Sequence, residues 1–454
     1  MVKHHHRKDF SPGFLLISGY AAAIVLGALL LCLPIAVQDQ PISFLDALFT
    51  ATSAQCVTGL SVVDTGSRFS LFGQLVILTL IQIGGLGITT FSVYLFFYLR
   101  KGVSARGRWM IQETLLHSPV ASLRQLIQQV FLLTMIIEGI GALLLSITFI
   151  PQFGWIKGGY YALFHSISAF CNAGFSLFPD SLVQYRNNPL VNFTVIGLIV
   201  FGGIGFLVLR ELIDKVRHKE TRRHLSLHTR LVLITTAVLL VGGTLMIYLL
   251  EFPSTLSHLG TGEGFLTVLF QSVTTRTAGF NTIDFNCFEA PTLFFIMFLM
   301  FVGASPGSSG GGIKTTSLAL FFAILISRLR GEPHTSIFRR TIPDEIATKT
   351  LTLMMLAGFF LFAATFALLT VQLWGQPFAA SHGGFMDYTF EAVSAFATVG
   401  LSLGATATLV PLGKIIIILL MFVGRVGLLT IAFTIISRTR NGAIHYAEEN
   451  IMIG

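Results

Sequence analysis

The chain has 454 residues, of which 53% are hydrophobic and only 11% are charged. A soluble globular protein carries about 25% charged residues, so this composition excludes a soluble fold. The formal net charge of +8 does not indicate a nucleic-acid partner, because the distribution of charge between the two sides of a membrane accounts for it.

Long apolar runs recur along the chain. Helices through residues 13–37, 71–99, 190–209 and 415–436 would each cross a hydrocarbon layer of about 30 Å. The first run follows three basic residues but no cleavage pattern of a signal peptide, so we expect it to be retained. The chain is therefore predicted to be an all-α polytopic protein of the cell membrane with eight spanning segments.

Positive charge gathers after every second long apolar run. These basic clusters lie at residues 100–108, 210–230, 328–340 and 438–440. Because Lys and Arg are enriched in cytoplasmic loops, the pattern places the clusters and both termini in the cytoplasm. The opposite side carries mostly Asp and Glu, and an acidic outer mouth concentrates cations.

One motif occurs four times around a single glycine. An aromatic residue or leucine stands ten positions before each of Gly59, Gly174, Gly279 and Gly400. Serine stands six positions before the glycine in three copies, whereas Val273 has this position in the third copy. Such repetition marks structural units. We therefore divide the chain into four units, residues 1–108, 109–225, 226–340 and 341–454.

Each repeated segment has about 15 residues, which is too few to span a membrane but enough for a re-entrant helix. Irregular backbone at membrane depth is tolerated only where protein or a watery cavity satisfies its polar groups. Each unit is therefore predicted to contain a span, a pore helix, a short extended strand and a second span. The four units would surround one central pore.

The repeated glycine suits the chemistry of potassium. A ring of backbone carbonyls can replace the hydration shell of this ion, and glycine adopts the left-handed conformation that such a strand needs. Close helix packing is the alternative role of a membrane glycine, but four matched positions favour an ion filter. The predicted ligands are the carbonyls of Val57, Thr58, Gly59, Asn172, Ala173, Gly174, Thr277, Ala278, Gly279, Thr398, Val399 and Gly400.

A second glycine cluster lies in the second span of units one, two and four. In the fourth unit, Arg425 stands where Gly85 and Gly203 stand in the others. An arginine at membrane depth is costly and faces a cavity or a partner. The third unit differs again, because residues 303–317 interrupt a long apolar stretch with glycines, a proline and hydroxyl residues that cannot form a regular helix.

Two enzymatic patterns occur in this interruption, and neither has the required context. Residues 303–307 fit G-x-S-x-G, but no strand–turn–helix or histidine base accompanies them. Residues 307–315 nearly fit a phosphate-binding loop, but Ile313 separates the last glycine from Lys314 and no strand precedes them. The sequence is therefore not predicted to be an enzyme.

The filter segments resemble those of the Trk/Ktr/HKT superfamily of potassium transporters, Thr-Ala-Gly-Phe-Asn and Thr-Val-Gly-Leu-Ser in particular. The resemblance covers nearly the whole chain, which is most similar to Ktr-type membrane subunits because it begins directly with the first unit. It implies a homodimer in membrane lipid, with one pore per protomer, on a cytosolic ring of nucleotide-binding regulatory subunits.

In this family the interrupted span acts as an intramembrane gate. The resemblance therefore implies gating roles for Gly303, Ser305, Gly307, Ser308, Ser309, Gly310, Gly311, Gly312, Lys314 and Arg425. Arg276 lies at the end of the third pore helix, where an unpaired cation would oppose conduction. We expect it to point away from the pore and to support the filter by pairing with Glu391 of the neighbouring pore helix.

The predicted function is potassium uptake through a selective, gated, channel-like pore, without a covalent cofactor. Obligatory symport with sodium or protons is the alternative, with sodium as a coupling or activating ion. An alternating-access symporter would show an inverted repeat, whereas these four units run in one direction.

Overall fold

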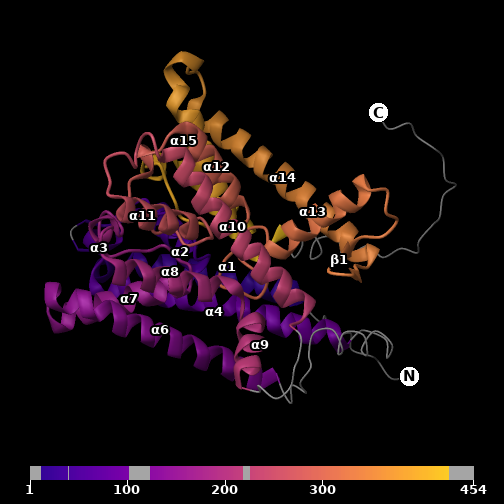
Figure 1. Cartoon of the computed structure of the whole chain (residues 1–454). Helices are drawn as coiled ribbons and strands as arrows, with labels where there is room; N and C mark the ends of the chain where they lie inside the picture. The colour runs from indigo at the N-terminus through magenta and orange to yellow at the C-terminus, as the bar shows by residue number, and fades with distance from the viewer. Residues whose placement is uncertain (1–11, 39, 102–122, 218–224, 429–454) are drawn as a thin grey trace, which may run out of the picture.

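A computed structural model describes residues 12–38, 40–101, 123–217 and 225–428 of the chain (Figure 1). The predictions for the N-terminus, for residues 429–454 and for part of each of the first two basic clusters lie outside this range. The secondary structure of the described residues is almost entirely helical, as predicted, and includes one short hairpin. The hairpin pairs β1 (Ser336–Ile337) with β2 (Arg340–Thr341) antiparallel, with Ser336 opposite Thr341.

The first two units each place a largely buried pore helix between two outer helices. The first unit contains α1 (Pro12–Leu31), a 3₁₀ turn (Pro34–Ala36), α2 (Phe44–Gln55), α3 (Thr65–Arg68) and α4 (Leu71–Lys101). The second contains α6 (Leu123–Phe153), α7 (Trp155–Phe170), a 3₁₀ turn (Val183–Tyr185), α8 (Pro189–Ile204) and α9 (Phe206–Arg217). The predicted pore helices of these units are α2 and α7.

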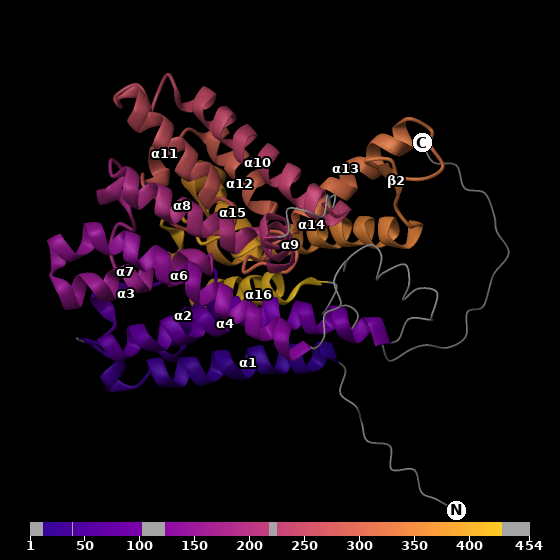
Figure 2. The same cartoon turned by 60° about the horizontal axis from the view of Figure 1, so that its bottom comes forward.

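The other two units repeat this order. The third contains α10 (Leu227–Glu251), α11 (Thr261–Thr274), a 3₁₀ turn (Phe285–Cys287), α12 (Ala290–Phe301) and α13 (Thr315–Leu329). The fourth contains α14 (Asp344–Leu373), α15 (Phe378–Ala397), a 3₁₀ turn (Ala405–Thr408) and α16 (Pro411–Val426). In Figure 2, α1 and α4 lie side by side at one edge of the molecule, and α10 and α12 lie side by side at the other.

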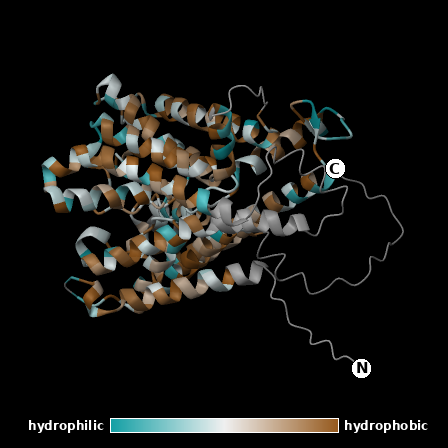
Figure 3. Ribbon diagram, turned by 90° about the horizontal axis from the view of Figure 1, so that it is seen from below, coloured by the Kyte–Doolittle hydropathy of each residue, from teal (hydrophilic) through white to brown (hydrophobic). Residues whose placement is uncertain are grey.

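The short helices are buried and the long ones are exposed. Phe49, Phe164 and Phe390 stand at the repeated aromatic position and are fully buried, which anchors α2, α7 and α15 in the interior. By contrast, Phe359 and Phe362 of α14 are 72% and 70% exposed. Apolar residues cover much of the helical surface in Figure 3. An apolar exterior of this kind faces hydrocarbon rather than water.

Three described helices are long and apolar enough to cross a membrane unaided, in Gln128–Phe153, Leu227–Glu251 and Asp344–Leu373. A fourth candidate joins α8 to α9 through a bend of 103°. The sequence predicted a break only in the third unit, yet the second unit is also broken, at Gly205, whose φ is 98°. α16 ends in the same way at Gly427, the equivalent position, where φ is 90°.

Candidate functional site: a glycine ring and the loop beneath it

The four repeated segments leave their pore helices in one conformation. Val57, Asn172, Thr277 and Thr398 have φ between 51° and 66°, and each stands two residues before a filter glycine. The glycines themselves have φ of 95°, 69°, 76° and 92°. Left-handed backbone costs a residue with a Cβ about 1–2 kcal/mol, so it persists only where the surroundings enforce it. We call residues 57–59, 172–174, 277–279 and 398–400 the filter segments.

The filter segments meet in a closed ring. A Cβ added to Gly59 would lie 2.6 Å from the Ala173 carbonyl oxygen, and one added to Gly174 would lie 2.9 Å from that of Ala278. A Cβ added to Gly279 would lie 2.5 Å from the Val399 carbonyl oxygen, and one added to Gly400 would lie 2.0 Å from the Thr58 carbonyl oxygen. Each glycine thus lies against a carbonyl of the next unit, in chain order, and the fourth unit closes on the first.

Hydroxyl groups from the pore helices hold these segments. Ser53 Oγ accepts from the Gly59 amide at 3.1 Å, and Ser394 Oγ accepts from the Gly400 amide at 3.1 Å. In the other two units the hydroxyl donates to the carbonyl that follows the glycine, from Ser168 to Phe175 and from Thr274 to Phe280. Sequence reasoning treated Val273 as the exception and missed Thr274, the hydroxyl residue beside it.

A cavity of about 340 Å³ opens onto the ring, and all four filter glycines line it. Asp64, Asp180 and Asp284 also line this cavity, one from each of the first three units. Charges of one sign in a cleft raise the local concentration of the opposite ion. Three carboxylates in one cavity therefore favour cations near the ring.

On the other side of the ring lies the central loop, residues 302–314, which separates α12 from α13. Residues 315–317 belong to α13, so the loop is shorter than predicted. A Cβ added to Gly310 would lie 2.2 Å from Thr277 Oγ1, and the Gly311 amide donates to Thr398 Oγ1 at 3.2 Å. The loop thus touches the filter segments of units three and four directly.

Hydrogen bonds also fasten the central loop to the second unit. Ser309 Oγ donates to the carbonyls of Phe170 and Gly202, both at 3.1 Å, and the Ser305 amide donates to Gly203 O at 3.0 Å. The Phe206 amide, the first of α9, donates to Gly307 O at 3.1 Å. Within the loop, Ser308 Oγ donates to Ser305 O at 2.6 Å, and Gly312 has a φ of 65°.

A buried arginine and a partly buried lysine bind carbonyl oxygens of the loop. Arg425 Nη1 donates to Ser309 O, while Nη2 donates to Gly84 O of α4 at 2.7 Å. Lys314 Nζ donates to Gly310 O at 2.7 Å. The guanidinium of Arg425 therefore joins the loop of unit three to the second span of unit one. The structure brings together all the residues predicted to form a gate.

The predicted pairing of Arg276 with Glu391 is wrong. Arg276 Nη2 donates to Gly303 O at 2.9 Å, whereas Glu391 accepts from Ser402 and from both the amide and the hydroxyl of Thr406. The two residues stand three and nine positions before their filter glycines, a difference of about 9 Å along a helix. They lie at different depths, so Glu391 fixes the chain after the fourth filter segment instead.

The described residues contain no group of three or more His, Cys, Asp or Glu side chains that could hold a metal ion. Asn172 adds a side chain to the ring, because its Nδ2 donates to Arg276 O and Thr277 Oγ1, both at 3.3 Å. This amide joins the second and third filter segments.

Comparisons with known proteins agree with this architecture. The chain is 42% identical over 447 residues to Ktr system potassium uptake protein B of Bacillus subtilis, covering 98% of this chain and 97% of the relative. It is 40% identical to the protein of the same name from Vibrio alginolyticus, covering 100% and 97%. It is also 36% identical to the potassium/sodium uptake protein NtpJ of Enterococcus hirae, covering 100% of both.

Among solved structures, the potassium transporter TrkH from Vibrio parahaemolyticus superposes with a TM-score of 0.74. The alignment covers 97% of this chain and 87% of that one at 17% identity, so the likeness concerns the fold. Residues 7–443 match the family TrkH, described as cation transport protein. This family consists of transporters rather than enzymes. On this match and on the full-length identity to its relatives, the chain belongs to the TrkH family of cation transport proteins.

Proposed function

We propose that this chain takes up potassium through a pore that runs along the axis of the glycine ring. The observation that carries the proposal is the closed ring itself, in which four chain segments present carbonyl oxygens and glycines to one another. Such a ring can replace the hydration shell of potassium without burying fixed charge. The chain also matches two potassium uptake proteins over 97% of the length of each.

The ligands in this proposal are the backbone carbonyls of the filter segments. Positive φ at the first and third residue of each segment, but not at the middle residue, allows successive carbonyls to point the same way. The pore helices end at the ring, so their negative dipole ends favour a cation there. Specificity for potassium thus rests on backbone geometry that the hydroxyls of Ser53, Ser168, Thr274 and Ser394 maintain.

The central loop is the gate in this proposal. It lies directly beneath the filter segments of units three and four, and its hydrogen bonds reach unit two and, through Arg425, unit one. Opening requires Ser309 O to leave Arg425, whereas the bond from Lys314 to Gly310 O lies within the loop and can move with it. Charge-assisted hydrogen bonds of this kind contribute about 1.5–3 kcal/mol each, which is sufficient to keep the closed arrangement dominant.

The proposed topology has eight spans in four units with the boundaries at residues 108, 225 and 340. The spans are α1, α4, α6, α8, α10, the interrupted α12–α13 pair, α14 and α16, and α9 follows α8 after the bend of 103°. The acidic cavity faces outward and the basic clusters and both termini face the cytoplasm, as the enrichment of Lys and Arg in cytoplasmic loops requires.

The proposed assembly is a homodimer in the cell membrane that binds a cytosolic ring of nucleotide-binding subunits. The names of the two Ktr relatives describe a protein B within a system, which implies additional components. Copurification of the full chain with soluble proteins of its own cell, followed by mass measurement of the complex, tests this. A monomer without partners under all conditions would contradict it.

Coupling to a second ion is the remaining alternative, and the Enterococcus relative named a potassium/sodium uptake protein favours it. We propose uncoupled flow, because the four units have one orientation and one continuous ring. The test is the reversal potential of purified protein in liposomes under independent gradients of potassium, sodium and protons. A reversal potential that follows potassium alone supports the pore, while a fixed shift with a sodium or proton gradient would establish symport.

A further inference from the structure

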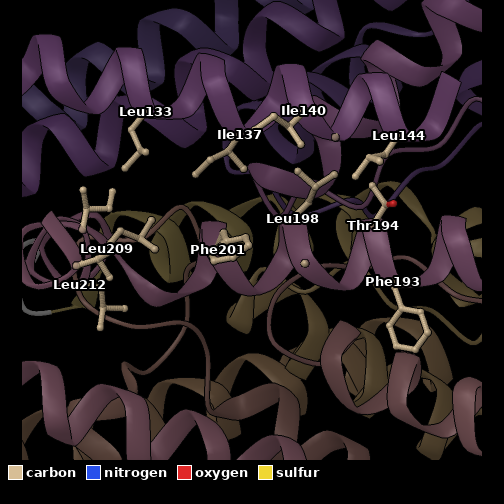
Figure 4. A pocket seen from close by; sticks show the side chains of 14 residues that line it. Leu133, Ile137, Ile140, Leu144, Phe193, Thr194, Leu198, Phe201, Leu209 and Leu212 are labelled. Atoms are coloured by element: carbon tan, nitrogen blue, oxygen red, sulfur yellow. The ribbon is translucent and has the colours of Figure 1, made fainter. Parts of the chain in front are cut away.

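A large groove lies on the side of the second unit, apart from the ring. It encloses about 660 Å³, within the range of small-molecule sites. In Figure 4, Leu133, Ile137, Ile140 and Leu144 of α6 face Phe201, Leu198 and Thr194 of α8, and Leu209 and Leu212 of α9 lie at one end. The groove is thus a space between three helices of a single unit.

The lining of the groove offers nothing to a polar ligand. Thr194 is the one lining residue with a polar side chain, and its hydroxyl already donates to Leu190 O at 2.6 Å. Gly197 lies on the groove, and a Cβ added there would meet nothing within 4 Å. A polar occupant would lose hydrogen bonds without replacement. The occupant is therefore apolar along its length.

The helix that closes the groove, α9, has the pattern of a membrane-surface helix. It leaves α8 at 103°, so it cannot continue in the spanning direction. Leu209, Leu212, Ile213 and Val216 line the groove, while Arg210, Glu211, Asp214 and Lys215 form its polar face. An amphipathic helix of this kind lies at the boundary between headgroups and acyl chains.

The polar face of α9 favours an anionic headgroup at the groove's end. Glu211 is engaged by Ser226, whose amide donates to Oε1 at 2.6 Å, and Asp214 lies 3.7 Å from Arg210. Lys215 is exposed beside Val216, a lining residue. Basic residues next to the cytoplasmic surface attract anionic lipids.

The groove is connected to the central loop in two ways. The Phe206 amide of α9 donates to Gly307 O at 3.1 Å. A smaller cavity of about 30 Å³ shares Leu133, Phe201 and Leu209 with the groove, and its opposite wall is formed by Gly307, Ser308 and Ser309. A single layer of side chains therefore separates an occupant of the groove from the loop residue that Arg425 binds.

We propose that the groove binds one acyl chain of an anionic phospholipid from the cytoplasmic leaflet, and that this lipid stabilises the closed position of the central loop. The regulatory half rests on the proposed gating function. The groove is present in the structure in which the loop is held beneath the filter, which we take as the closed state. A lipid that binds this closed state more tightly than the open state shifts the population toward the closed state. A second copy of the chain is the competing occupant, but a narrow concave groove with no polar partner matches a flexible chain better than a helical face.

Binding is tested with brominated lipid, which quenches tryptophan. Phe201→Trp places the probe on the groove, and Phe359→Trp on α14 is the matched control, because Phe359 is exposed without lining it. Both are made after Trp109, Trp155 and Trp374 are changed to Phe. In detergent, quenching of the groove tryptophan should saturate as the mole fraction of brominated phosphatidylglycerol rises, while quenching of the control tryptophan should increase linearly over the same range. Brominated phosphatidylcholine should reach half-maximal quenching of the groove tryptophan only at a higher mole fraction.

Equal, linear quenching at both positions would overturn the lipid site. Efficient disulfide cross-linking between two copies carrying Phe201→Cys would also overturn it, because it would assign the groove to a second copy. The chain's own cysteines, Cys32, Cys56, Cys171 and Cys287, are changed to Ser for that experiment.

Regulation is tested by filling the groove. Gly197→Phe should occupy it, and Gly358→Phe on α14 is the control, since an added Cβ meets nothing within 4 Å at either position. Potassium flux of the wild type and of the control should fall about fivefold from phosphatidylcholine to phosphatidylglycerol liposomes. Flux of Gly197→Phe should be low in both.

A wild type whose flux is the same in both lipids would overturn the regulatory half. If the wild type carries no potassium flux in any lipid, the proposed function fails, and the quenching experiment still decides whether the site exists.

Discussion

The filter segments and the central loop lie against one another but are constructed in opposite ways. Each filter segment is one of four versions of the same turn, and its glycine contacts the next unit in the same manner. The loop occurs once, in the third unit, and its contacts with each of the other units are different. Coordination of a bare ion needs ligands on all sides, while a blocking element needs to come from only one side.

This contrast explains how one chain can separate selectivity from control. A repeated segment cannot change without disturbing the ring, because a Cβ added to any of the four filter glycines would lie 2.9 Å or less from a carbonyl oxygen of the next unit. The loop is also tightly packed, but its contacts are not repeated around the ring, and some of its partners, such as Arg425 and Phe206, lie outside the filter segments. Changes in the loop should therefore alter rate, and changes in the filter segments should alter selectivity.

The largest effect is expected from breaking the repeated part. Gly400→Ser and Gly59→Ser place a Cβ 2.0 Å and 2.6 Å from a carbonyl oxygen of the next unit and impose left-handed backbone on a residue with a Cβ. Displacing that oxygen should abolish discrimination between potassium and sodium and lower potassium uptake at least about tenfold, since 1.4 kcal/mol is enough. Competitive uptake of the two ions in potassium-uptake-deficient cells measures both.

Gly404→Ser is the matched control for this prediction. Its φ is also 92°, but a Cβ there meets nothing within 4 Å, so it reports the cost of the left-handed backbone without the clash. Potassium selectivity that survives in both filter variants would contradict the carbonyl ring.

The second prediction breaks the unique part. Arg425→Ala removes two charge-assisted hydrogen bonds, to Ser309 O and Gly84 O. At about 1.5–3 kcal/mol each, their loss should raise the maximal potassium flux about tenfold while selectivity remains intact. Deleting part of residues 308–312 should act in the same direction. Uptake rates normalised to membrane protein measure the change.

Arg425→Lys sharpens this test, because one ammonium group keeps the charge but cannot easily reach both carbonyls. It should fall between the wild type and Arg425→Ala. If the maximal uptake rate is unchanged or lower in both Arg425→Ala and the deletion, the loop is not a gate and only interrupts the helix.

Arg276 connects the two parts, and its expected effect is smaller. It precedes Thr277 of the third filter segment and donates one hydrogen bond to Gly303 O at the start of the loop. Arg276→Met should raise the maximal flux by less than Arg425→Ala, because one bond is lost rather than two. Arg276→Glu with Glu391→Arg should not recover the uptake lost in Arg276→Glu alone, and recovery of uptake in this double variant would restore the pairing that the structure rejects.

The smallest effect concerns the support of the ring. Lys414 of α16 lies 2.5 Å from Asp46 of α2, and Arg186, which precedes α8, lies 2.8 Å from Glu263 of α11. In both cases a residue that follows the filter segment of one unit pairs with the pore helix of the next. A double-mutant cycle with Lys414→Met and Asp46→Asn should give a coupling of about 0.5–1 kcal/mol, measured by thermal unfolding in detergent. The exposed Lys349–Glu345 pair is the control and should couple less, and a coupling no larger than this control would show that the pair does not support the ring.

The repeated features of the structure could be predicted from the sequence, because a pattern that recurs at matched positions in four segments is unlikely to arise by chance. The positions of the four filter glycines could therefore be predicted from the repeat alone. The left-handed conformation of Val57 and Thr398 could not be predicted, since tertiary contacts enforce it against the preference of the residue. The partner of Arg276 could not be predicted either. The repeat indicates that the third and fourth pore helices are neighbours, but it does not give the depth of Glu391 relative to Arg276.

The break at Gly205 shows the same limit. The first unit has the related motif Gly84-Gly85-Leu86-Gly87, and α4 continues through it. In the second unit, Gly205 lies against Pro306 O and the next amide bonds Gly307 O, so the helix is interrupted by its contact with the central loop. A local motif permits the break, and a partner distant in the sequence decides it.

The seam between the first and last units has a consequence for synthesis of the protein. Gly400 meets Thr58 O, Lys414 pairs with Asp46, and Arg425 bonds Gly84 O, all without a covalent link between these units. A ribosome must therefore complete almost the entire message before the ring can close. Chains released early lack the fourth side of the ring and cannot form a selective conduit.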